Sequence, residues 1–306
     1  MSDHVFLDLP ALLNPGDLLI VNETRVRAAR LRGRRRETGG EVEFLFLEQL
    51  ADGNWETLAR PARRLRSGVM VDVDGAVVTV VRNMGEGLVV VSLDTDRPEE
   101  LFASAGSVPL PPYFTGELAD PERYQTPFAN RPGSAAAPTA GLHFTADVID
   151  GLETRGVGLA TVDLHVSLDT FRPMTVDDLD DHVMHMEWCS VPDSTAKAIS
   201  DTRDRGGRVV AVGTTVVRTL ESRADGVGGV IAGSGPTDLF LRPGSRLTVV
   251  DLLVTNFHLP GSTLLVLLEA FMGSGWRDVY TTALERGYRI LSFGDAMLCE
   301  LGPPSE

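Results

Sequence analysis

Hydrophobic positions between residues 17 and 95 occur in short runs, some of which alternate with polar residues. Asp-Gly and Gly-Glu-Gly turns separate many of these runs. A period of two, interrupted by such turns, predicts short antiparallel strands in a small barrel or sandwich. The expected strands cover residues 17–22, 41–47, 55–58, 69–73, 76–81 and 88–93. A short helix at 98–105 and an extended proline-rich segment at 108–113 would end this domain.

From about residue 134 the pattern changes to helical periodicity that alternates with apolar strands. We expect helices at 145–155, 194–205, 214–223, 262–272 and 278–286, and strands at 159–166, 208–212, 249–256 and 289–293. Thr145 supplies an N-cap for the first helix, and Gly206-Gly207 ends the second. The alternation predicts an α/β core.

Composition narrows the class of protein. The chain has 306 residues, of which 43% are hydrophobic, a globular composition. No uncharged apolar stretch approaches the roughly 18 to 20 residues that a membrane span needs. Cys189 and Cys299 cannot make a disulfide framework, and the first residues lack signal-peptide features. We therefore expect a soluble cytoplasmic protein.

Charge is unevenly distributed along the chain. The net charge of −15 argues against a protein that coats nucleic acid nonspecifically. Arginine is nevertheless concentrated in two clusters, the first comprising Arg25, Arg27, Arg30, Arg32, Arg34, Arg35 and Arg36, and the second Arg60, Arg63, Arg64 and Arg66. Each cluster is either a solvated strand edge or a phosphate-binding face.

Several common catalytic motifs are absent from the sequence. The single lysine, Lys197, follows an alanine, so there is no P-loop. No G-x-G-x-x-G opens a helix, and there is no G-x-S-x-G nucleophile elbow. The chain is therefore neither a standard dinucleotide-binding protein nor a serine hydrolase of that type.

Histidines gather in the segment that precedes residue 190. His182, His185 and Cys189 have a spacing that could hold a metal, although no paired cysteine motif accompanies them. The alternative is a loop leading into a strand, with histidines that form hydrogen bonds or transfer protons. We favour the second interpretation and expect no metal.

The turn Gly213-Thr214-Thr215 joins a strand to a helix and predicts an anion site. Glycine permits close approach, and the helix N-terminus favours a carboxylate or phosphate. Arg218 lies about one turn into the helix, and Glu221 could hold a ribose or an amine. The alternative is an ordinary helix start.

Two other expected strands end in polar residues. Asp163 and His165 lie at the end of one, and Asn256 and His258 follow the other. Because α/β proteins bind ligands at the carboxyl ends of their strands, these residues are candidates for a site.

A series of motifs in this order resembles one known family. They are GDLLIVNETRV at 16–26, ARL at 29–31, RP at 60–61, VPLPPY at 108–113, RYQT at 123–126, PTAGLHF at 138–144, LHV at 164–166, TFRP at 170–173, MHMEW at 184–188, AVGTT at 211–215, VRTLES at 217–222, TDLF at 237–240, TNFHLP at 255–260 and FGDAM at 293–297. Together they resemble the S-adenosylmethionine:tRNA ribosyltransferase-isomerases of queuosine biosynthesis, across essentially the whole chain.

The resemblance implies an α/β core of residues 1–24 and 113–306 with an inserted antiparallel β-barrel at 25–112. It also implies transfer and isomerisation of the ribosyl group of S-adenosylmethionine onto 7-aminomethyl-7-deazaguanine at the tRNA wobble position. The products would be epoxyqueuosine, adenine and methionine. The expected partner is a tRNA with a GUN anticodon. We expect a monomeric enzyme that has no permanently bound cofactor and does not bind a membrane.

The sequence departs from the family pattern in three places. A family segment with an Arg-x-x-Ser-Arg-Leu-like stretch, expected before Ser2, is missing. Ser167, Leu168 and Asp169 replace a Gly-Ala-Gly, and Met186 and Cys189 replace a serine and a tyrosine. These departures leave an alternative, a non-catalytic or altered-specificity relative that binds tRNA or nucleotide.

The implied reaction needs a base beside the sulfonium and a proton donor for adenine, and histidine suits both. We expect His165, oriented by Asp163, to act as base or acid. His143, His185 and His258 are expected to position substrate or transfer protons. The residues expected to bind S-adenosylmethionine are Gly213, Thr214, Thr215, Arg218, Glu221 and Asn256.

Overall fold

The computed structural model describes residues 1–302 apart from 112, 115–117, 167–173, 175 and 177. Its contacts divide the chain into two compact units. The first comprises Met1–Arg25, Glu122–Arg131 and Ala137–Glu306, and the second Val26–Pro121 and Pro132–Ala136. The sequence-based bounds, 1–24 with 113–306 and 25–112, stay a prediction. In the described residues, no helix is both long and apolar enough to cross a membrane.

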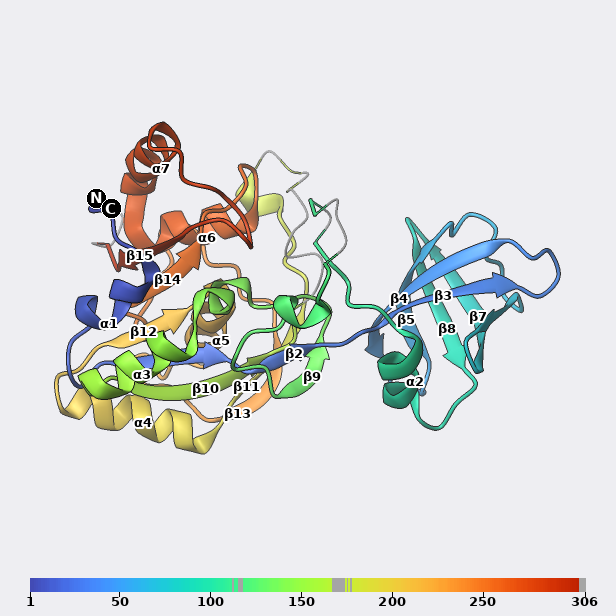
Figure 1. Ribbon diagram of the computed structural model, residues 1–306, viewed down its shortest axis with the longest axis horizontal. Coiled ribbons are helices and arrows are strands. Elements are labelled where there is room, and N and C mark those ends of the chain that lie inside the picture. The colour runs from blue at the N-terminus through green and yellow to red at the C-terminus, as the bar shows by residue number, and fades with distance from the viewer. Residues whose placement is uncertain (112, 115–117, 167–173, 175, 177, 303–306) are drawn as a thin grey trace. The chain divides into compact units, whose positions relative to one another are not determined.

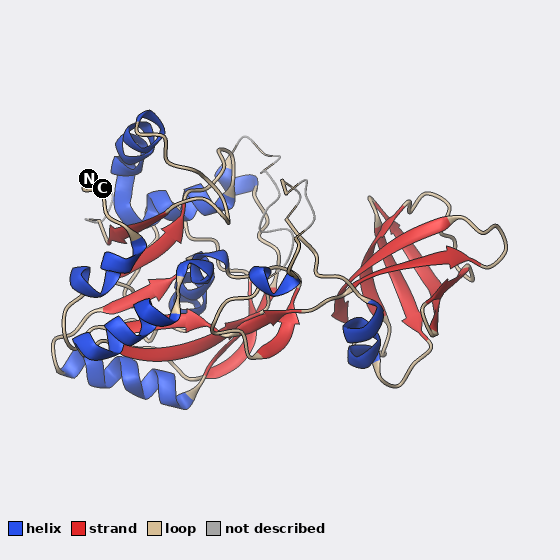
Figure 2. Ribbon diagram, viewed as in Figure 1, coloured by secondary structure: helices blue, strands red, loops and turns tan. Residues whose placement is uncertain are grey.

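The first unit is built on a seven-stranded sheet with the order β13-β11-β10-β1-β12-β14-β15 (Figures 1 and 2). Four neighbouring strands run parallel: β10 (Gly158–Leu164), β1 (Leu18–Asn22), β12 (Val209–Val212) and β14 (Leu252–Asn256). Antiparallel strands flank them on both sides, β11 (Glu187–Val191) beside β10 and β15 (Ala296–Glu300) beside β14, and β13 (Gly233–Thr237) pairs antiparallel with β11. The central strands β1, β12 and β14 are buried throughout, as expected for parallel strands covered on both faces.

Helices cover both faces of this sheet (Figure 1). One hydrophobic cluster joins the sheet to α1 (Leu9–Leu12) and α3 (Ala146–Arg155). The other joins it to α4 (Asp193–Asp204), α5 (Thr214–Ser222) and α6 (Thr263–Met272), with α7 (Trp276–Glu285) packed beside α6. Short 3-10 helices lie at Phe6–Asp8, Pro121–Tyr124, Thr139–His143, Leu179–Asp181 and Gly273–Gly275. The core is therefore a three-layer α/β sandwich.

The second unit is a closed six-stranded antiparallel barrel. Its strands are β3 (Arg30–Arg35), β4 (Glu41–Gln49), β5 (Trp55–Arg60), β8 (Leu88–Leu93), β7 (Ala76–Gly85) and β6 (Met70–Val73), in spatial order. Buried aromatic rings of Phe44, Phe46 and Trp55 contact Phe102 of α2 (Pro98–Ala105) or one another. Two further short strands, β2 (Thr24–Val26) and β9 (Arg131–Ser134), pair with each other. The predicted fold class, an α/β core with a small antiparallel β-barrel, is confirmed.

Two local predictions are corrected by the structure, and one strand was not predicted. Residues 17–22 do not extend the antiparallel region, because β1 pairs in parallel with β10 and β12 at the centre of the core sheet. Residues 289–293 are not a strand, and the last strand is Ala296–Glu300. The arginine-rich β3 was not expected, because its few apolar positions give no clear alternation.

Candidate functional site

The carboxyl ends of four parallel strands meet at one edge of the core sheet. From β10 to β14, these ends present His165, Asn22, Gly213 and Asn256. The chain order reverses around β1, because β10 and β12 lie on opposite sides of it. Ligands of open α/β sheets bind at such an edge beside the reversal point. We call this edge the carboxyl edge.

Asp163 and His165 come together at the end of β10. His165 Nε2 lies 3.6 Å from Asp163 Oδ2, and its side chain is 38% exposed. Asp163 is buried, and its other oxygen, Oδ1, has no hydrogen-bond partner in the structure. The pair places a partly exposed imidazole beside a buried carboxylate at the end of β10.

The turn after β12 has the geometry of an anion site. Gly213 has φ +90°, which favours glycine, and its missing Cβ would lie 3.5 Å from Ala140 Cβ and 3.6 Å from Thr215 Oγ1. Thr214 and Thr215 begin α5 and are buried. Thr215 Oγ1 has no hydrogen-bond partner in the structure. The helix N-terminus and an unpaired hydroxyl are thus next to each other.

Arg218 is buried one helical turn beyond this threonine. Its guanidinium forms an ion pair with the Glu187 carboxylate at the start of β11, and its Nε donates to the Leu239 carbonyl at 3.1 Å. Its Nη2 has no hydrogen-bond partner in the structure. Glu187 is therefore engaged by the arginine that we expected to bind S-adenosylmethionine.

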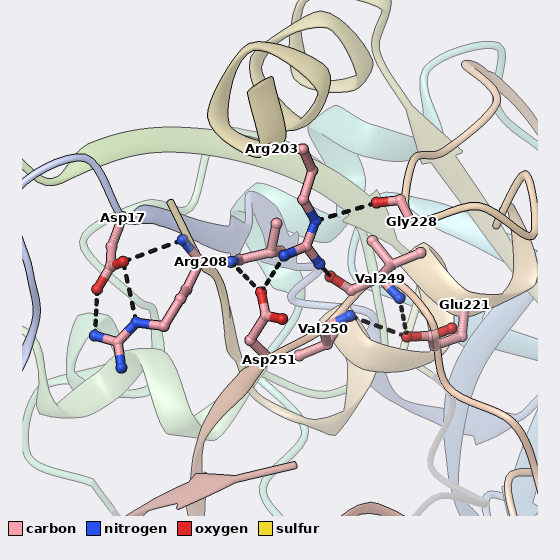
Figure 3. Close-up of polar contacts among 9 residues, drawn as sticks. Asp17, Arg203, Arg208, Glu221, Gly228, Val249, Val250 and Asp251 are labelled. Carbon is pink, nitrogen blue, oxygen red and sulfur yellow. Dashed lines mark hydrogen bonds and ion pairs between the residues drawn. The ribbon is translucent and has the colours of Figure 1, made fainter. Parts of the chain in front are cut away.

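Glu221 does not lie at the predicted turn. Helix α5 runs back across the sheet at about 1.5 Å per residue, which carries Glu221 roughly 10 Å beyond Thr214. Its carboxylate accepts from the backbone N–H groups of Thr248, Val249 and Val250 at 3.0, 3.0 and 3.1 Å. Figure 3 shows the contacts of Val249 and Val250. Burial raises the pKa of Glu221, although these N–H groups oppose the rise. Glu221 therefore holds the segment before β14, at the opposite edge of the sheet.

Asn256 organises a second polar group at the end of β14. Its Nδ2 contacts His143 Nε2 at 2.8 Å and the Leu291 carbonyl at 3.4 Å, and its Oδ1 accepts from Thr139 Oγ1 at 3.0 Å. Because a carbonyl can only accept, Nδ2 is the amide nitrogen, and His143 Nε2 must accept from it. The imidazole is therefore neutral, with its proton on Nδ1.

The surroundings of His143 favour this neutral form. Burial lowers the pKa of His143, although the negative charge of Asp295 opposes the change. The ring stacks on Phe6 with centroids 5.2 Å apart. His143 at neutral pH can donate through Nδ1 but is a poor carrier of an additional proton.

His258 is buried beneath the same edge. Its Nε2 lies 3.0 Å from Thr255 Oγ1, and its backbone N–H donates to Tyr280 Oη at 2.7 Å. Burial lowers the pKa of His258 to about 4, so the ring is neutral at physiological pH. Proton transfer by this residue, as expected from the sequence, is disfavoured by its burial.

The alternative metal site does not assemble in the described residues. His182 packs against the Phe240 ring with centroids 5.0 Å apart, and the buried Cys189 Sγ lies 3.6 Å from Ser222 Oγ. In the part of the chain that the structure describes, no three histidine, cysteine or acidic residues are placed to hold a metal. His185 is exposed in the segment before β11. Ser167, Leu168 and Asp169, which replace the Gly-Ala-Gly of the family, lie outside the described residues.

The candidate site residues that include His165 and His143 form two separate groups. Neighbouring strands lie about 4.8 Å apart, so the ends of β10 and β14 are separated by roughly 14 Å. The Asp163–His165 pair is in one group and the His143–Asn256 contact in the other, with the Gly213 turn between them.

Two cavities adjoin the second group. One, of about 750 Å³, is lined by His143, Tyr288 and Asp295 among others. The other, of about 430 Å³, is lined by Arg25, Arg123 and residues near them. Both volumes suit small ligands, for which about 300 to 1,000 Å³ is usual.

Sequence reasoning missed several polar residues at this edge. Asn22 is buried, and its amide bonds the Leu164 backbone through both N–H and C=O groups. Glu23 contacts Asn130 and Arg131, and Thr139 completes the Asn256 group. Their position in family-like motifs, Asn22 and Glu23 at 16–26 and Thr139 at 138–144, was the available signal.

Comparison with known proteins gives one consistent result. A model of the family described as "Queuosine biosynthesis protein" matches residues 1–299. An S-adenosylmethionine:tRNA ribosyltransferase-isomerase of Moorella thermoacetica is 48% identical over 298 residues, covering 96% of this chain and 87% of the relative. A protein of the same name from Symbiobacterium thermophilum is 50% identical over 302 residues, covering 97% and 89%.

A solved structure agrees with these sequence matches. The crystal structure of the S-adenosylmethionine tRNA ribosyltransferase from Thermotoga maritima matches this chain with a TM-score of 0.51 and 34% sequence identity. The match covers 96% of this chain and 86% of the Thermotoga maritima chain. Since the family model spans nearly all of the sequence, and relatives with about half of their residues identical align over 96% or more of it, this chain belongs to the queuosine biosynthesis protein family.

Proposed function

We propose that this protein is an enzyme that transfers and isomerises the ribosyl group of S-adenosylmethionine onto 7-aminomethyl-7-deazaguanine in tRNA. The modified base becomes epoxyqueuosine, and adenine and methionine are released. The observation that carries the proposal is the identity of 48 to 50% to proteins named for this activity, over 96% or more of the chain.

S-adenosylmethionine binds at the carboxyl edge in this proposal. Its carboxylate meets the N-terminus of α5, where the Gly213 turn leaves space and Thr215 Oγ1 is unpaired. Thr214 lies in the first turn of α5, and Arg218, about one turn further along the helix, supplies positive charge. Asn256 holds His143 so that Nδ1–H is free to donate to the substrate. Glu221 is left out of this site, because its carboxylate is engaged elsewhere.

His165 is the proposed proton carrier. The reaction must remove a proton from the carbon next to the sulfonium and supply one to the departing adenine. The partly exposed imidazole, 3.6 Å from a carboxylate that can orient it, is proposed for either step, because imidazole can act as a general acid or base. His143 and the exposed His185 are assigned to positioning, and the buried His258 to supporting the Thr255 end of β14.

The RNA substrate is proposed to be a tRNA with a GUN anticodon that carries the deazaguanine precursor. The protein would act as a monomer in the cytoplasm, where this tRNA is found, and without a permanently bound cofactor. Each of these statements can be tested separately by substrate variation, solution mass and metal analysis.

Incubation with S-adenosylmethionine and precursor tRNA tests the proposal, with released adenine as the readout. We expect adenine and epoxyqueuosine in equal amounts. Thermal shift provides a second measurement, because ligand at 100 times its dissociation constant stabilises a protein by about 2.7 kcal/mol. Stabilisation by S-adenosylmethionine without adenine release would overturn the enzyme assignment in favour of a binding relative.

A further inference from the structure

The arginines of the barrel unit fall into two groups that differ in their ion pairs. Apart from Arg35, the arginines of β3 and of the residue after it face acidic side chains on neighbouring strands. Arg32 lies 3.1 Å from Glu43, Arg34 lies 2.9 Å from Glu41, and Arg36 lies 2.7 Å from Asp72. The antiparallel register sets Arg32 opposite Glu43 and Arg34 opposite both Glu41 and Asp72. This first cluster is largely neutralised within the barrel.

The second group lies in the connection between β5 and β6. Arg63, Arg64 and Arg66 are exposed, and residues 61–68 contain no acid. Within the described residues, none of the three forms an ion pair or a side-chain hydrogen bond. We call residues 61–68 the arginine loop.

The arginine loop is fixed to the barrel by its other residues. Leu65 is 1% exposed and anchors the middle of the loop in the barrel core. Asn83 Nδ2 on β7 donates to the carbonyls of Ala62 and Leu65 at 2.9 and 2.8 Å. The Gly68 N–H donates to the Val80 carbonyl at 2.8 Å. The loop backbone is therefore held in place before any partner binds, so less ordering entropy is lost on binding.

Guanidinium groups without carboxylate partners are suited to phosphate. They donate in pairs to phosphate oxygens, and a net charge of −15 makes a local positive loop stand out from the rest of the protein. We infer that the arginine loop binds the phosphodiester backbone of the tRNA substrate, whereas the β3 arginines stabilise the barrel. This inference rests on the proposed function, which supplies an RNA as the partner.

Matched neutralising variants test the inference in the full chain. Arg63→Gln with Arg64→Gln removes two unpaired charges, and Arg32→Gln with Arg34→Gln removes two paired ones. Filter binding of precursor tRNA between 50 and 200 mM salt gives the affinity and its salt dependence. We expect the loop variant to bind at least about tenfold more weakly, and the slope of log K against log salt to become shallower by about 1.4 to 1.8.

The paired variant and further readouts separate the outcomes. The paired variant should keep the wild-type slope, although its thermal midpoint falls slightly. Stabilisation by S-adenosylmethionine should be unchanged in both variants, which shows that they are folded. Equal tRNA binding and slope in the loop variant and wild type would overturn the inference while leaving adenine release, and thus the proposed function, intact.

Two other outcomes would also overturn it. Equal losses in both variants would indicate a general electrostatic field rather than the loop. Loss of binding to phosphatidylserine vesicles, with unchanged tRNA binding, would assign the loop to a membrane surface. If wild-type protein neither bound tRNA nor released adenine, the proposed function and the inference would fail together.

Discussion

The two edges of the core sheet differ in whether their buried polar groups are paired. At the edge where the parallel strands begin, charged groups pair with one another (Figure 3). Asp17 before β1 accepts from the Arg208 guanidinium at 2.6 and 3.1 Å, and Asp251 before β14 accepts from Arg203 and the Val209 N–H, both at 2.6 Å. One hydroxyl there, Thr248 Oγ1, has no hydrogen-bond partner within the described part of the chain.

The carboxyl edge leaves buried hydrogen-bonding capacity unused. Among the residues that the structure describes, Asp163 Oδ1 and Thr215 Oγ1 have no hydrogen-bond partner, and neither has Arg218 Nη2 about one turn further along α5. An unsatisfied buried polar group costs about 1 to 3 kcal/mol, which a ligand that pairs with it can recover. The contrast supports the proposal that one edge stabilises the fold and the other binds substrate. Substitutions at the two edges should therefore have opposite consequences.

The largest effect is expected from substitutions at the end of β10. His165→Ala should lower turnover on the order of 10²-fold or more, because the proposed proton carrier is lost. Asp163→Asn should also lower turnover, because the imidazolium loses its carboxylate neighbour. Adenine release at saturating substrates measures both, and the thermal midpoint should stay near that of wild type. Near-normal turnover in both variants would show that another group carries the proton.

The opposite edge should give the complementary result. Asp17→Asn should lower the free energy of unfolding by about 2 kcal/mol, because a buried carboxylate that accepts from Arg208 and Asn14 becomes neutral. Urea unfolding measures this change, and turnover per folded molecule should be unchanged. A loss of turnover without a loss of stability would contradict the division between the edges.

The pH dependence of the same pair has a defined sign. Burial acts to raise the pKa of Asp17, but hydrogen bonds from Arg208 and the Asn14 backbone outweigh it and hold the pKa below its ordinary value of 3.8. The folded state thus favours the charged form. Its contribution to stability is complete above about pH 4 and is lost as the pH falls through the lowered pKa. Asp17→Asn should lose this acid dependence.

Local chemistry made part of this arrangement predictable. The Thr145 cap, the Gly213 turn and the apolar runs predicted helices and strands close to those observed, because each signal lies within a few residues. The polar ends of β10 and β14 were also evident from sequence. The remaining features depend on residues far apart in the chain.

Long-range pairing explains what the sequence could not reveal. Arg218 meets Glu187 across 31 positions, and His143 meets Asn256 across 113. Glu221 follows Thr215 by six residues, yet the antiparallel course of α5 takes it to the other edge. The sequence left open whether the β3 arginines form a solvated strand edge or a phosphate-binding face, and the barrel register places Glu41, Glu43 and Asp72 beside them.

A fourth prediction concerns the buried His258. Its pKa of about 4 in the folded state lies below the ordinary 6.5, so the unfolded state binds more protons between these values. Stability should therefore fall as the pH drops below 6.5, by about 1.4 kcal/mol between pH 7.5 and 5.5. His258→Gln should remove this component, measured as the difference in unfolding free energy between variant and wild type. Parallel pH profiles would show that His258 is protonated equally in both states.

The smallest effect is expected at the two ends of α5, and it compares the edges within one helix. Thr215→Val replaces a hydroxyl that is unpaired in the free protein, and it should weaken S-adenosylmethionine binding about 2- to 10-fold, the value of one hydrogen bond of about 0.5 to 1.5 kcal/mol. Glu221→Gln should leave this affinity unchanged and lower the thermal midpoint, because the carboxylate holds the backbone at 248–250. Calorimetric titration with S-adenosylmethionine measures the first effect and thermal unfolding the second.

Because valine has nearly the shape of threonine, the first substitution tests the hydroxyl and not the packing. If Glu221→Gln weakened binding and Thr215→Val did not, the ligand would lie at the wrong end of the helix for the carboxyl edge to be the site.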